Sequence, residues 1–418
     1  MRRLAVLSLH TSPLAQPGSG DGGGMNVYVR QLSSALARAG AVCDVYTRAW
    51  APDVPATVSV EPGFQVHHIP AGPLAPVGKE ALPGLVDEFT EGVLARIAAS
   101  VDCGRCGPPD ALHANYWLSG LAGHVIKHEL GLPLASTFHT LDRVKAETSP
   151  EEAVAAEPAR RAEAEAGVIA CSDAVLASCS VEADQLVALY GADPDRIETV
   201  APGVDGAFFA PGDRGQARRA LGLPVDRPLL AFVGRIQPLK GAEVALRALA
   251  IVRERVPGAL LAVIGGPSGP AGHRELARLR AVVAELGLGE SVRFVPPQPH
   301  ELLSTWYRAM EVCLVPSRSE SFGLVALEAG ACGTPVVANA VGGLPTLVED
   351  GATGFLVEGR DPAGFAEAAL GVLGDPRLAQ TLSRRAVARA SGYTWSAAGS
   401  RLLDLYARLI DRELVACD

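Results

Sequence analysis

Two glutamates in the second half of the sequence are well placed to bind hydroxyl groups. Glu320 and Glu328 enclose the segment Glu320-Ser-Phe-Gly-Leu-Val-Ala-Leu-Glu328. The pattern predicts that Glu320 lies in a loop at a helix N-terminus, exposed to solvent, and that Glu328 lies about two turns into that helix. A carboxylate can accept from two vicinal hydroxyls, so Glu320 suits a sugar and Glu328 a ribose, with phosphates between them at the helix N-terminus. The alternative is an amphipathic helix with one exposed glutamate.

Two cations, Arg235 and Lys240, follow an apolar run that ends at Gly234. An arginine binds a phosphate through a bidentate fork and a lysine acts as a point charge, so this pair could clamp a pyrophosphate. Basic residues in a loop are more often simply solvated, and the pair alone is only moderately specific.

The glycine-rich stretch Gly18–Gly24 contains the string G-x-G-x-x-G, which also occurs in dinucleotide-binding dehydrogenases. In those proteins the glycines form a tight turn between strand and helix, whereas residues 10–17 intervene here. Asp44 is expected inside the second strand and not at its end, where ribose recognition would need it. The stretch therefore favours a phosphate-binding loop before a helix over Met25–Ala39, and the alternative is a mobile surface loop.

Two further loops and one cysteine pair carry reactive side chains. His113-Ala-Asn-Tyr116 and Thr137-Phe-His-Thr140 follow apolar runs, and from spacing alone their histidines stay open between a structural and a functional role. Cys103 and Cys106 have ligand spacing, but further ligands at a recognisable distance are missing, so a polar loop is favoured over zinc.

Short β-branched runs alternate with helical stretches along the chain, which is typical of parallel sheets covered by helices. Residues 199–213, rich in Pro and Gly, separate two such series. We predict an α/β fold of two Rossmann-like domains, residues 1–203 and 204–395, facing across a cleft, and a C-terminal helix at 396–418 that packs back toward the first domain. The predicted strands are Leu4–Leu9, Val42–Thr47, Gln65–Ile69, Ala111–Ala114, Leu134–Phe138, Gly167–Cys171, Leu229–Gly234, Leu260–Gly265, Val292–Val295, Val312–Pro316 and Pro335–Ala338.

Composition narrows the class of partner. The 418 residues are 48% hydrophobic, with a formal charge of -9, which disfavours nucleic acid and anionic membranes and favours a small substrate. The short apolar stretch at the N-terminus predicts a buried strand. No run of apolar residues in the sequence is long enough to span a membrane. Eight scattered cysteines suit reduced thiols, so we expect a cytoplasmic protein.

Together these residues resemble a known family, the retaining glycosyltransferases of family four, which have the two-domain GT-B fold. Glu320-x7-Glu328, Gly234-Arg-x4-Lys240 and the glycine stretch carry the resemblance, which spans almost the entire chain. Within the family, the chain most resembles the D-inositol-3-phosphate glycosyltransferases of mycothiol biosynthesis. The segments that do so are His10–Tyr28, Lys79-Glu-x-Leu-Pro83, Tyr116–Gly120, His139–Lys145 and Gly265–Pro270.

The resemblance implies a retaining hexosyltransferase that moves a sugar from a nucleotide sugar, UDP-N-acetylglucosamine in that subfamily, to inositol phosphate. It implies catalytic roles for His139, Arg235, Lys240 and Glu320. It implies that the donor is held by Gln16, Gly24, Arg235, Lys240, Gln298, Glu320, Ser321, Phe322, Gly323, Leu324 and Glu328. The acceptor phosphate would be bound by Lys79, Tyr116, Thr140 and Arg161, or Arg160 in the neighbouring register, with His10 and Asn26 near the inositol ring.

The chain departs from the subfamily in several places. His113-Ala-Asn-Tyr116 replaces a His-Ser-His-Tyr string, Asp142 and Arg143 replace small apolar residues, Gln298 replaces an arginine near the expected base pocket, and the Cys103–Cys106 loop is unfamiliar. The acceptor and the base therefore stay open. The alternatives are an enzyme of specialised metabolism with a different donor, GDP-sugars included, and an unphosphorylated acceptor, or an enzyme like sucrose-phosphate synthase.

The resemblance also implies a same-face displacement, in which the departing diphosphate takes the acceptor proton and His139 orients the donor sugar. It requires no cofactor or tightly bound metal and leaves room for magnesium near Tyr307, Arg308 and Thr334. A homodimer is left open. Three other classes are alternatives to this family: a dehydrogenase, a non-catalytic sugar-nucleotide-binding protein and a lipid-directed mannosyltransferase, the last disfavoured by the acidic charge balance.

Overall fold

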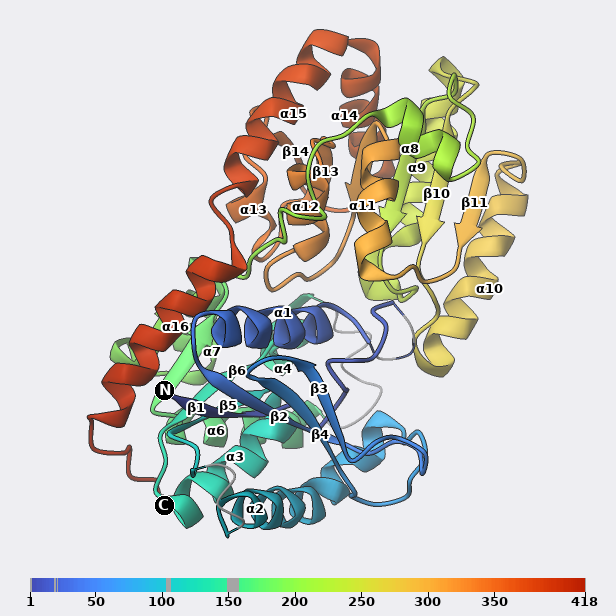
Figure 1. Ribbon diagram of the computed structural model, residues 1–418. Coiled ribbons are helices and arrows are strands. Elements are labelled where there is room, and N and C mark those ends of the chain that lie inside the picture. Colours follow the sequence, from blue (N-terminus) through green and yellow to red (C-terminus); the bar gives the residue numbers. More distant parts are fainter. Residues whose placement is uncertain (1, 19, 21, 103–106, 149–157, 418) are drawn as a thin grey trace. The chain divides into compact units, whose positions relative to one another are not determined.

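The computed structural model describes residues 2–18, 20, 22–102, 107–148 and 158–417 (Figure 1). The chain divides into two compact units, each described here by itself. Unit 1 comprises residues 1–15, 25–202 and 395–418, and unit 2 comprises residues 16–24 and 203–394. The Cys103–Cys106 pair and residues 19 and 21 of the glycine stretch lie outside the described residues.

Unit 1 is built on an eight-stranded sheet with the strand order β3-β4-β2-β1-β5-β6-β7-β8. All pairs are parallel except β3 with β4. The central strands are buried because helices cover both faces of a parallel sheet. The strands are β1 (Arg3–Leu7), β2 (Val42–Arg48), β3 (Thr57–Glu61), β4 (Phe64–Ile69), β5 (Ala111–Asn115), β6 (Leu134–Thr137), β7 (Ala174–Ala177) and β8 (Ile197–Thr199).

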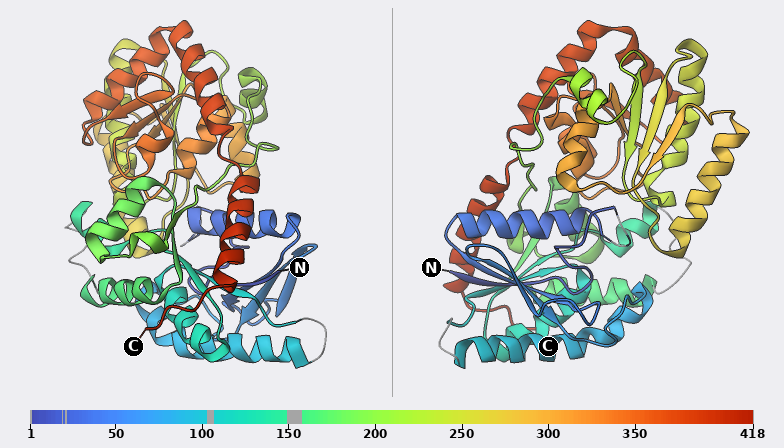
Figure 2. Two further views of the ribbon diagram at one scale, coloured as in Figure 1. Left: turned by 90° about the vertical axis from the view of Figure 1, so that its left-hand side faces the viewer. Right: turned by 45° about the vertical axis from the view of Figure 1, so that its right-hand side comes forward.

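Side chains of these strands alternate between the two faces of the sheet. Ala5 and Leu7 of β1 belong to a hydrophobic core that includes side chains of α2 (Val86–Asp102), α3 (Trp117–Leu130) and α6 (Pro158–Cys171). Helices α1 (Gly24–Arg38) and α2 lie on opposite sides of the sheet in both views of Figure 2. The unit also contains α4 (Asp142–Thr148), α7 (Ser180–Tyr190), η1 (Lys79–Leu85) and η2 (Pro194–Arg196).

The C-terminal helix α16 (Trp395–Ile410) joins unit 1 through a buried polar contact. The Tyr406 hydroxyl lies 2.8 Å from Nδ1 of His113 on β5, and Nε2 of the same ring lies 2.9 Å from Oγ1 of Thr137. A neutral imidazole satisfies both contacts, with one nitrogen as donor and the other as acceptor. His113 is completely buried, so its role is structural.

The strand predicted at Gly167–Cys171 is wrong, because these residues form the last turns of α6. The run Val168-Ile169 is apolar because both side chains are buried, and Val168 meets α3 where Gly120 leaves room for it. The strand that follows is β7, three residues further along. The short strands β3 and β8 were not predicted. Asp44 does lie inside β2, where its carboxylate forms an ion pair with Arg3 at 2.6 Å and a hydrogen bond with Nε2 of His67 at 3.0 Å.

Unit 2 is built on a six-stranded parallel sheet with the order β11-β10-β9-β12-β13-β14. An apolar core joins alternate residues of β9, β10 and β12 to three helices, α9 (Ala242–Arg255), α10 (Gly269–Glu285) and α14 (Pro362–Gly374). The strands are β9 (Leu229–Val233), β10 (Leu260–Ile264), β11 (Val292–Val295), β12 (Val312–Val315), β13 (Val336–Asn339) and β14 (Gly354–Val357). The other elements are α8 (Arg214–Ala220), η3 (Pro238–Lys240), α11 (His300–Ala309), α12 (Leu324–Ala331), α13 (Leu344–Leu347) and α15 (Pro376–Ala390).

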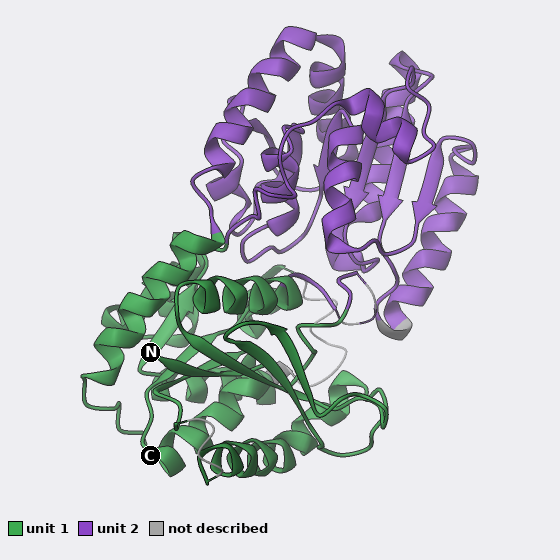
Figure 3. Cartoon of the chain, in the orientation of Figure 1, with its two compact units in different colours: residues 1–15, 25–202, 395–418 green, residues 16–24, 203–394 purple. Residues whose placement is uncertain are grey.

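Residues 16–24 belong to unit 2, although the segments before and after them belong to unit 1 (Figure 3). The Gly266 N–H donates to the Gly18 carbonyl at 3.1 Å, and Gln16 Nε2 donates to the Pro297 carbonyl at 3.1 Å. From the sequence, residues 16–24 are predicted within the first domain. The predicted domain boundaries, after residues 203 and 395, each lie one residue from a change of unit, at Pro202/Gly203 and Thr394/Trp395. Among the described residues, no helix is long and apolar enough to cross a membrane.

The burial of His113 makes the stability of the protein depend on pH. Burial lowers the pKa of His113 from 6.5 to about 4. The unfolded chain therefore binds more protons between these values, and the free energy of unfolding falls as the pH drops through this window, by up to about 1.4 kcal/mol per pH unit. Above pH 6.5 the contribution of the neutral ring is fully present.

We expect the urea midpoint of the His113→Asn protein to change less between pH 6.5 and 4.5 than that of the parent. Both proteins share all other titrating groups, so the difference between the two slopes isolates this ring. Parallel slopes would contradict a neutral, buried His113.

Candidate active site

Lys240 and Glu320 form an ion pair in unit 2. Lys240 ends η3, which follows β9, and its Nζ lies 2.7 and 2.9 Å from the two carboxylate oxygens of Glu320. Only 21% and 16% of the two side chains are exposed. The expectation of an exposed Glu320 is therefore wrong, because the lysine covers it. The bidentate contact fixes the orientation of the carboxylate before any ligand binds.

The backbone around Glu320 is held by close packing. Gly323 precedes α12 with a φ of 107°, a conformation that favours glycine, and so allows the chain to turn into the helix. The Glu320 carbonyl accepts a 3.0 Å hydrogen bond from the Gly343 N–H. Phe322 is buried, and its ring meets the Tyr393 ring edge-on with 5.8 Å between the ring centres, so its side chain belongs to the core. Phe322 could therefore take part in donor binding only through its backbone.

Glu328 lies on α12 and is buried. Its Oε2 accepts a 2.9 Å hydrogen bond from the Tyr307 hydroxyl, and its Oε1 lies 2.6 Å from Nε2 of His300. A carboxylate has about four acceptor positions, so two remain for a ribose. His300 was not predicted as a site residue, because one histidine beside prolines has no distinctive spacing.

Arg235 lies against the glycine stretch within unit 2. A Cβ atom at Gly23 would lie 3.2 Å from Nε of Arg235, and one at Gly24 would lie 3.5 Å from Cδ1 of Leu324. The arginine, the glycine stretch and the start of α12 are therefore neighbours. Gln298 is engaged in its own loop, since its Nε2 donates to the Pro296 carbonyl at 2.9 Å.

The predicted magnesium position does not match a magnesium site. Thr334 Oγ1 donates to the Tyr307 carbonyl at 2.5 Å, so these residues do lie together. Arg308, however, brings a guanidinium that donates to the Phe208 and Ala210 carbonyls at 3.1 and 3.2 Å. Magnesium prefers an octahedron of oxygens. The side chains of these three residues therefore do not fit that ion.

Several residues predicted to bind the acceptor lie together in unit 1 around Arg161. The Arg161 guanidinium lies 5.0 Å from the centre of the Tyr116 ring. Its NH2 donates to the carbonyl of Thr140 at 2.9 Å and to Oγ1 at 3.3 Å, and its Nε donates to Glu165 at 2.8 Å. Arg160 is exposed, so the structure places Arg161 and not its neighbour beside Thr140.

Lys145 joins Lys79 and Arg161 in what we call the cation cluster. Burial first, and then the charges of Arg161 and Lys79, lower the pKa of Lys145 to about 8, while Asp142 and Glu165 oppose the shift. Three cations thus act on one another within this part of unit 1. Lys145 stands in a segment that resembles the family but was not predicted as a site residue. No pattern in the sequence shows that α4 brings it to Lys79.

The two residues predicted near the inositol ring differ in their surroundings. The His10 ring lies 5.0 Å from the Tyr116 ring, beside the cation cluster. Asn26 is buried, and its Nδ2 donates to Thr11 Oγ1 at 2.6 Å and to the Ser12 carbonyl at 2.5 Å. Asn26 therefore holds the loop that follows β1.

Tyr116 and His139 are the non-glycine residues with positive φ in the described part of the chain, at 76° and 62°. Such conformations cost about 1–3 kcal/mol and cluster at functional sites. Nε2 of His139 lies 2.9 Å from Oδ1 of Asn115, a residue that was not predicted, and its ring meets the Tyr28 ring edge-on at 4.8 Å. Burial, with His113 nearby, lowers the pKa of His139 to about 3, so the ring is neutral at pH 7.

The lowered pKa of Lys145 predicts that anions bind unit 1 less tightly above pH 8. Lys145 loses its proton as the pH rises through about 8, which removes one charge from the cation cluster. Between pH 7 and 9 we expect sulfate affinity to fall roughly tenfold or more. The Lys145→Arg protein should keep its affinity, because arginine stays charged. Calorimetry with sulfate, whose charge is constant in this range, checks this, and the same fall in both proteins would contradict it.

Comparison with known proteins identifies glycosyltransferase domains in both halves of the chain. A family model described as "Glycosyl transferase 4-like domain" matches residues 23–203, and one described as "Glycosyl transferases group 1" matches residues 213–389. A D-inositol 3-phosphate glycosyltransferase of Actinosynnema mirum is 47% identical over 415 residues, which cover 98% of each chain. One from Acidothermus cellulolyticus is 48% identical over 409 residues, 97% of this chain and 90% of the relative.

The solved structure of sucrose-phosphate synthase from Thermosynechococcus elongatus has a TM-score of 0.87 and 33% identity, and the match covers 98% of this chain and 99% of that one. The predictions of a GT-B fold and of a glycosyltransferase are confirmed. The chain is a glycosyltransferase and belongs to the group 1 family that includes the D-inositol 3-phosphate glycosyltransferases.

Proposed function

We propose that this enzyme transfers N-acetylglucosamine from UDP-N-acetylglucosamine to inositol phosphate with retention of configuration. The observation that carries the acceptor half of the proposal is the cation cluster of Lys79, Lys145 and Arg161, with Tyr116 and Thr140 beside it. Two relatives, a D-inositol 3-phosphate glycosyltransferase and a sucrose-phosphate synthase, are both named after a phosphorylated small molecule.

The charges of the cluster favour a dianion over a neutral acceptor. Glu165 partly compensates Arg161 through a 2.8 Å ion pair, and the charges of Arg161 and Lys79 add to the effect of burial in lowering the pKa of Lys145. A bound phosphate would lower this repulsion and accept several charge-assisted hydrogen bonds. An unphosphorylated acceptor would leave the cations facing one another.

The donor half of the proposal rests on unit 2. Arg235, Lys240 and the Gly24 N–H would bind the diphosphate, Glu320 the sugar hydroxyls and Glu328 the ribose. The ion pair between Lys240 and Glu320 does not prevent this, because an ammonium group has three donors and can hold a carboxylate and a phosphate together. The assignment of a uracil base and of an N-acetyl group to the donor rests on the resemblance to the subfamily.

Transfer would follow a same-face displacement. The bond between the anomeric carbon and the diphosphate oxygen breaks, and the acceptor hydroxyl forms the new bond on the same side of the sugar. The leaving diphosphate takes the hydroxyl proton while Arg235 and Lys240 stabilise its charge. His139 would orient the donor sugar as a neutral hydrogen-bonding group, since its low pKa unsuits it to carrying a proton at pH 7.

A second candidate is an activity like that of sucrose-phosphate synthase, with a hexose phosphate as acceptor. The structural similarity to sucrose-phosphate synthase, with a TM-score of 0.87 at 33% identity, supports this second candidate. Both candidates use a phosphorylated acceptor. A cytoplasmic location and a homodimer stay predictions.

The direct test compares acceptors with a single donor. Purified enzyme is given UDP-N-acetylglucosamine with inositol phosphate, free inositol or a hexose phosphate, and release of UDP is measured. We expect turnover with inositol phosphate and little with free inositol. A preference for the hexose phosphate would support the second candidate, and a preference for unphosphorylated acceptors would overturn both.

Replacing one cation of the cluster should weaken acceptor binding alone. We expect Lys145→Ala and Lys79→Ala each to raise the acceptor KM roughly tenfold or more, which corresponds to about 1.5–3 kcal/mol for a charged hydrogen bond, with the donor KM unchanged. Arg143→Ala is the matched control. Arg143 is an exposed cation of the same helix as Lys145, and its guanidinium covers the Tyr190 ring at 4.7 Å. Equal effects of all three variants would contradict the cluster's role.

Glu320 should matter for turnover more than for folding when a substitution removes its charge but keeps its shape and an oxygen that can accept from Lys240. We expect Glu320→Gln to lower kcat tenfold or more, a barrier increase of about 1.4 kcal/mol, with a nearly unchanged melting temperature. Glu320→Ala should also lower the melting temperature, because it leaves the largely buried Lys240 without its carboxylate. The exposed Glu358, replaced by Gln, serves as control. Parent-like kcat in the Glu320→Gln enzyme would exclude a catalytic role.

A further inference from the structure

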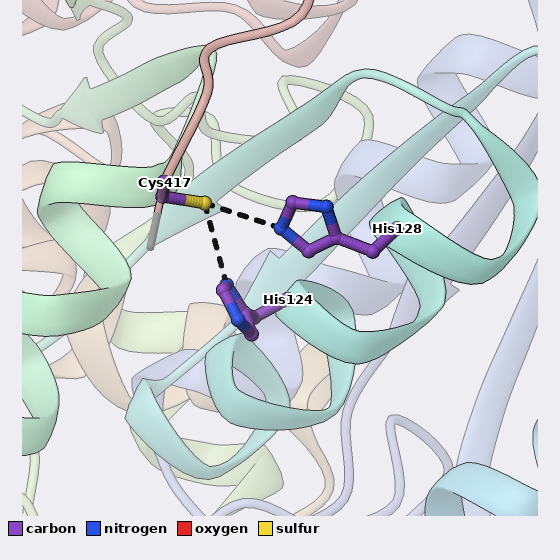
Figure 4. Close-up of side chains that lie close together, drawn as sticks. All are labelled: His124, His128 and Cys417. Atoms are coloured by element: carbon purple, nitrogen blue, oxygen red, sulfur yellow. Dashed lines mark hydrogen bonds between the residues drawn. The ribbon is translucent and has the colours of Figure 1, made fainter.

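Two histidines and a cysteine converge at the C-terminal end of the chain, in unit 1 (Figure 4). His124 and His128 lie one turn apart on α3, and their ring centres are 4.8 Å from each other. Cys417 Sγ lies 3.2 Å from Nε2 of His128 and 3.8 Å from Nδ1 of His124. Among the described residues this is the group of three metal-binding side chains whose ligand atoms lie within 4.8 Å of one another.

The spacing of the ligand atoms suits a tetrahedral zinc ion. Zinc bonds of about 2.3 Å to sulfur and 2.0–2.1 Å to nitrogen place these two ligand atoms about 3.6 Å apart at a tetrahedral angle. The two observed sulfur–nitrogen distances lie on either side of that value. Two histidines at positions i and i+4 of a helix present both rings on one face, which is a common way to hold this metal.

The tail that carries Cys417 is fixed by contacts that do not involve the cysteine. The Val415 N–H donates to Oδ1 of Asp173 at 2.7 Å. Asp173 in turn receives a 2.9 Å hydrogen bond from Lys127, a buried residue that lies between the two histidines on α3. The position of the tail on this helix is therefore built into the fold.

A second thiol lies beside Cys417. The side chain of Cys171, at the end of α6, is within hydrogen-bonding contact of the Cys417 side chain. Contacts of this kind can orient a metal-bound thiolate.

We propose that His124, His128 and Cys417 bind a zinc ion, with the fourth position taken by water. Cys417 loses its thiol proton to solvent when the metal binds, and the two neutral imidazoles coordinate through the nitrogens that face the sulfur. The ion fastens the C-terminal tail to α3. The site lies in unit 1 and uses none of the residues assigned to donor or acceptor binding, so it is independent of the proposed function.

The test measures zinc binding to the untagged full-length enzyme after chelator treatment. We expect one zinc per chain by calorimetry and elemental analysis, and a thiolate charge-transfer band when cobalt(II) replaces zinc. Cys417→Ser should abolish this band, and Cys417→Ser and His128→Ala should each weaken binding roughly tenfold or more. Both side chains are at least partly exposed, so melting temperatures of the metal-free proteins should match that of the parent.

Two controls separate this site from other ligands of the chain. His273→Ala removes an exposed histidine of α10, and the Cys103→Ser/Cys106→Ser double variant removes the pair with ligand spacing. Both should keep one zinc. Absence of zinc binding in the parent overturns the proposal, as does binding that survives Cys417→Ser and His128→Ala or is lost with Cys103 and Cys106. A Cys171–Cys417 disulfide in place of bound metal, detected by mass spectrometry without reductant, also overturns it.

Discussion

Burial of both faces of a parallel sheet is the constraint on which the rest of this structure depends. The central strands of each unit are buried along most of their length, because helices cover them on either side. Polar groups inside the strands, such as Asp44 and His113, are held by buried partners, and polar groups that can reach a ligand gather where the strands end. His139 follows β6, Lys240 follows β9 and Glu320 follows β12, so residues from distant parts of the chain reach the same edge of their own sheet.

The charges of the residues at these edges are balanced to different degrees in the two units. In unit 2 Lys240 is matched by Glu320, and this contact holds both side chains ready at little electrostatic cost. In unit 1 three cations, Lys79, Lys145 and Arg161, act with two carboxylates, Asp142 and Glu165, and the pKa of Lys145 is lowered first by burial and then by the two other cations. The ion pair in unit 2 holds the geometry of its site. The cation cluster in unit 1, with three cations and two carboxylates, favours the binding of an anion.

Much of the fold could be predicted because buried strands read as apolar runs and the motif from Glu320 to Glu328 fixes a loop and a helix. The prediction failed at Gly167–Cys171, where five residues are too few to separate a buried strand from one buried face of a helix. The exposure of Glu320 was misjudged because its partner lies far away in the sequence. Lys145 and Asn115 were missed for the same reason, since only folding brings them to Lys79 and His139.

The assignment of residues 16–24 to unit 2 has a consequence for any attempt to divide the enzyme. The chain passes between the units at four points, so no single cut yields two complete halves. A fragment that begins after residue 203 would lack the stretch whose carbonyl at Gly18 receives the Gly266 N–H and whose Gly23 lies against Arg235. Such a fragment would expose backbone that the intact protein covers. A circular permutant or a fusion that retains residues 16–24 would preserve this surface.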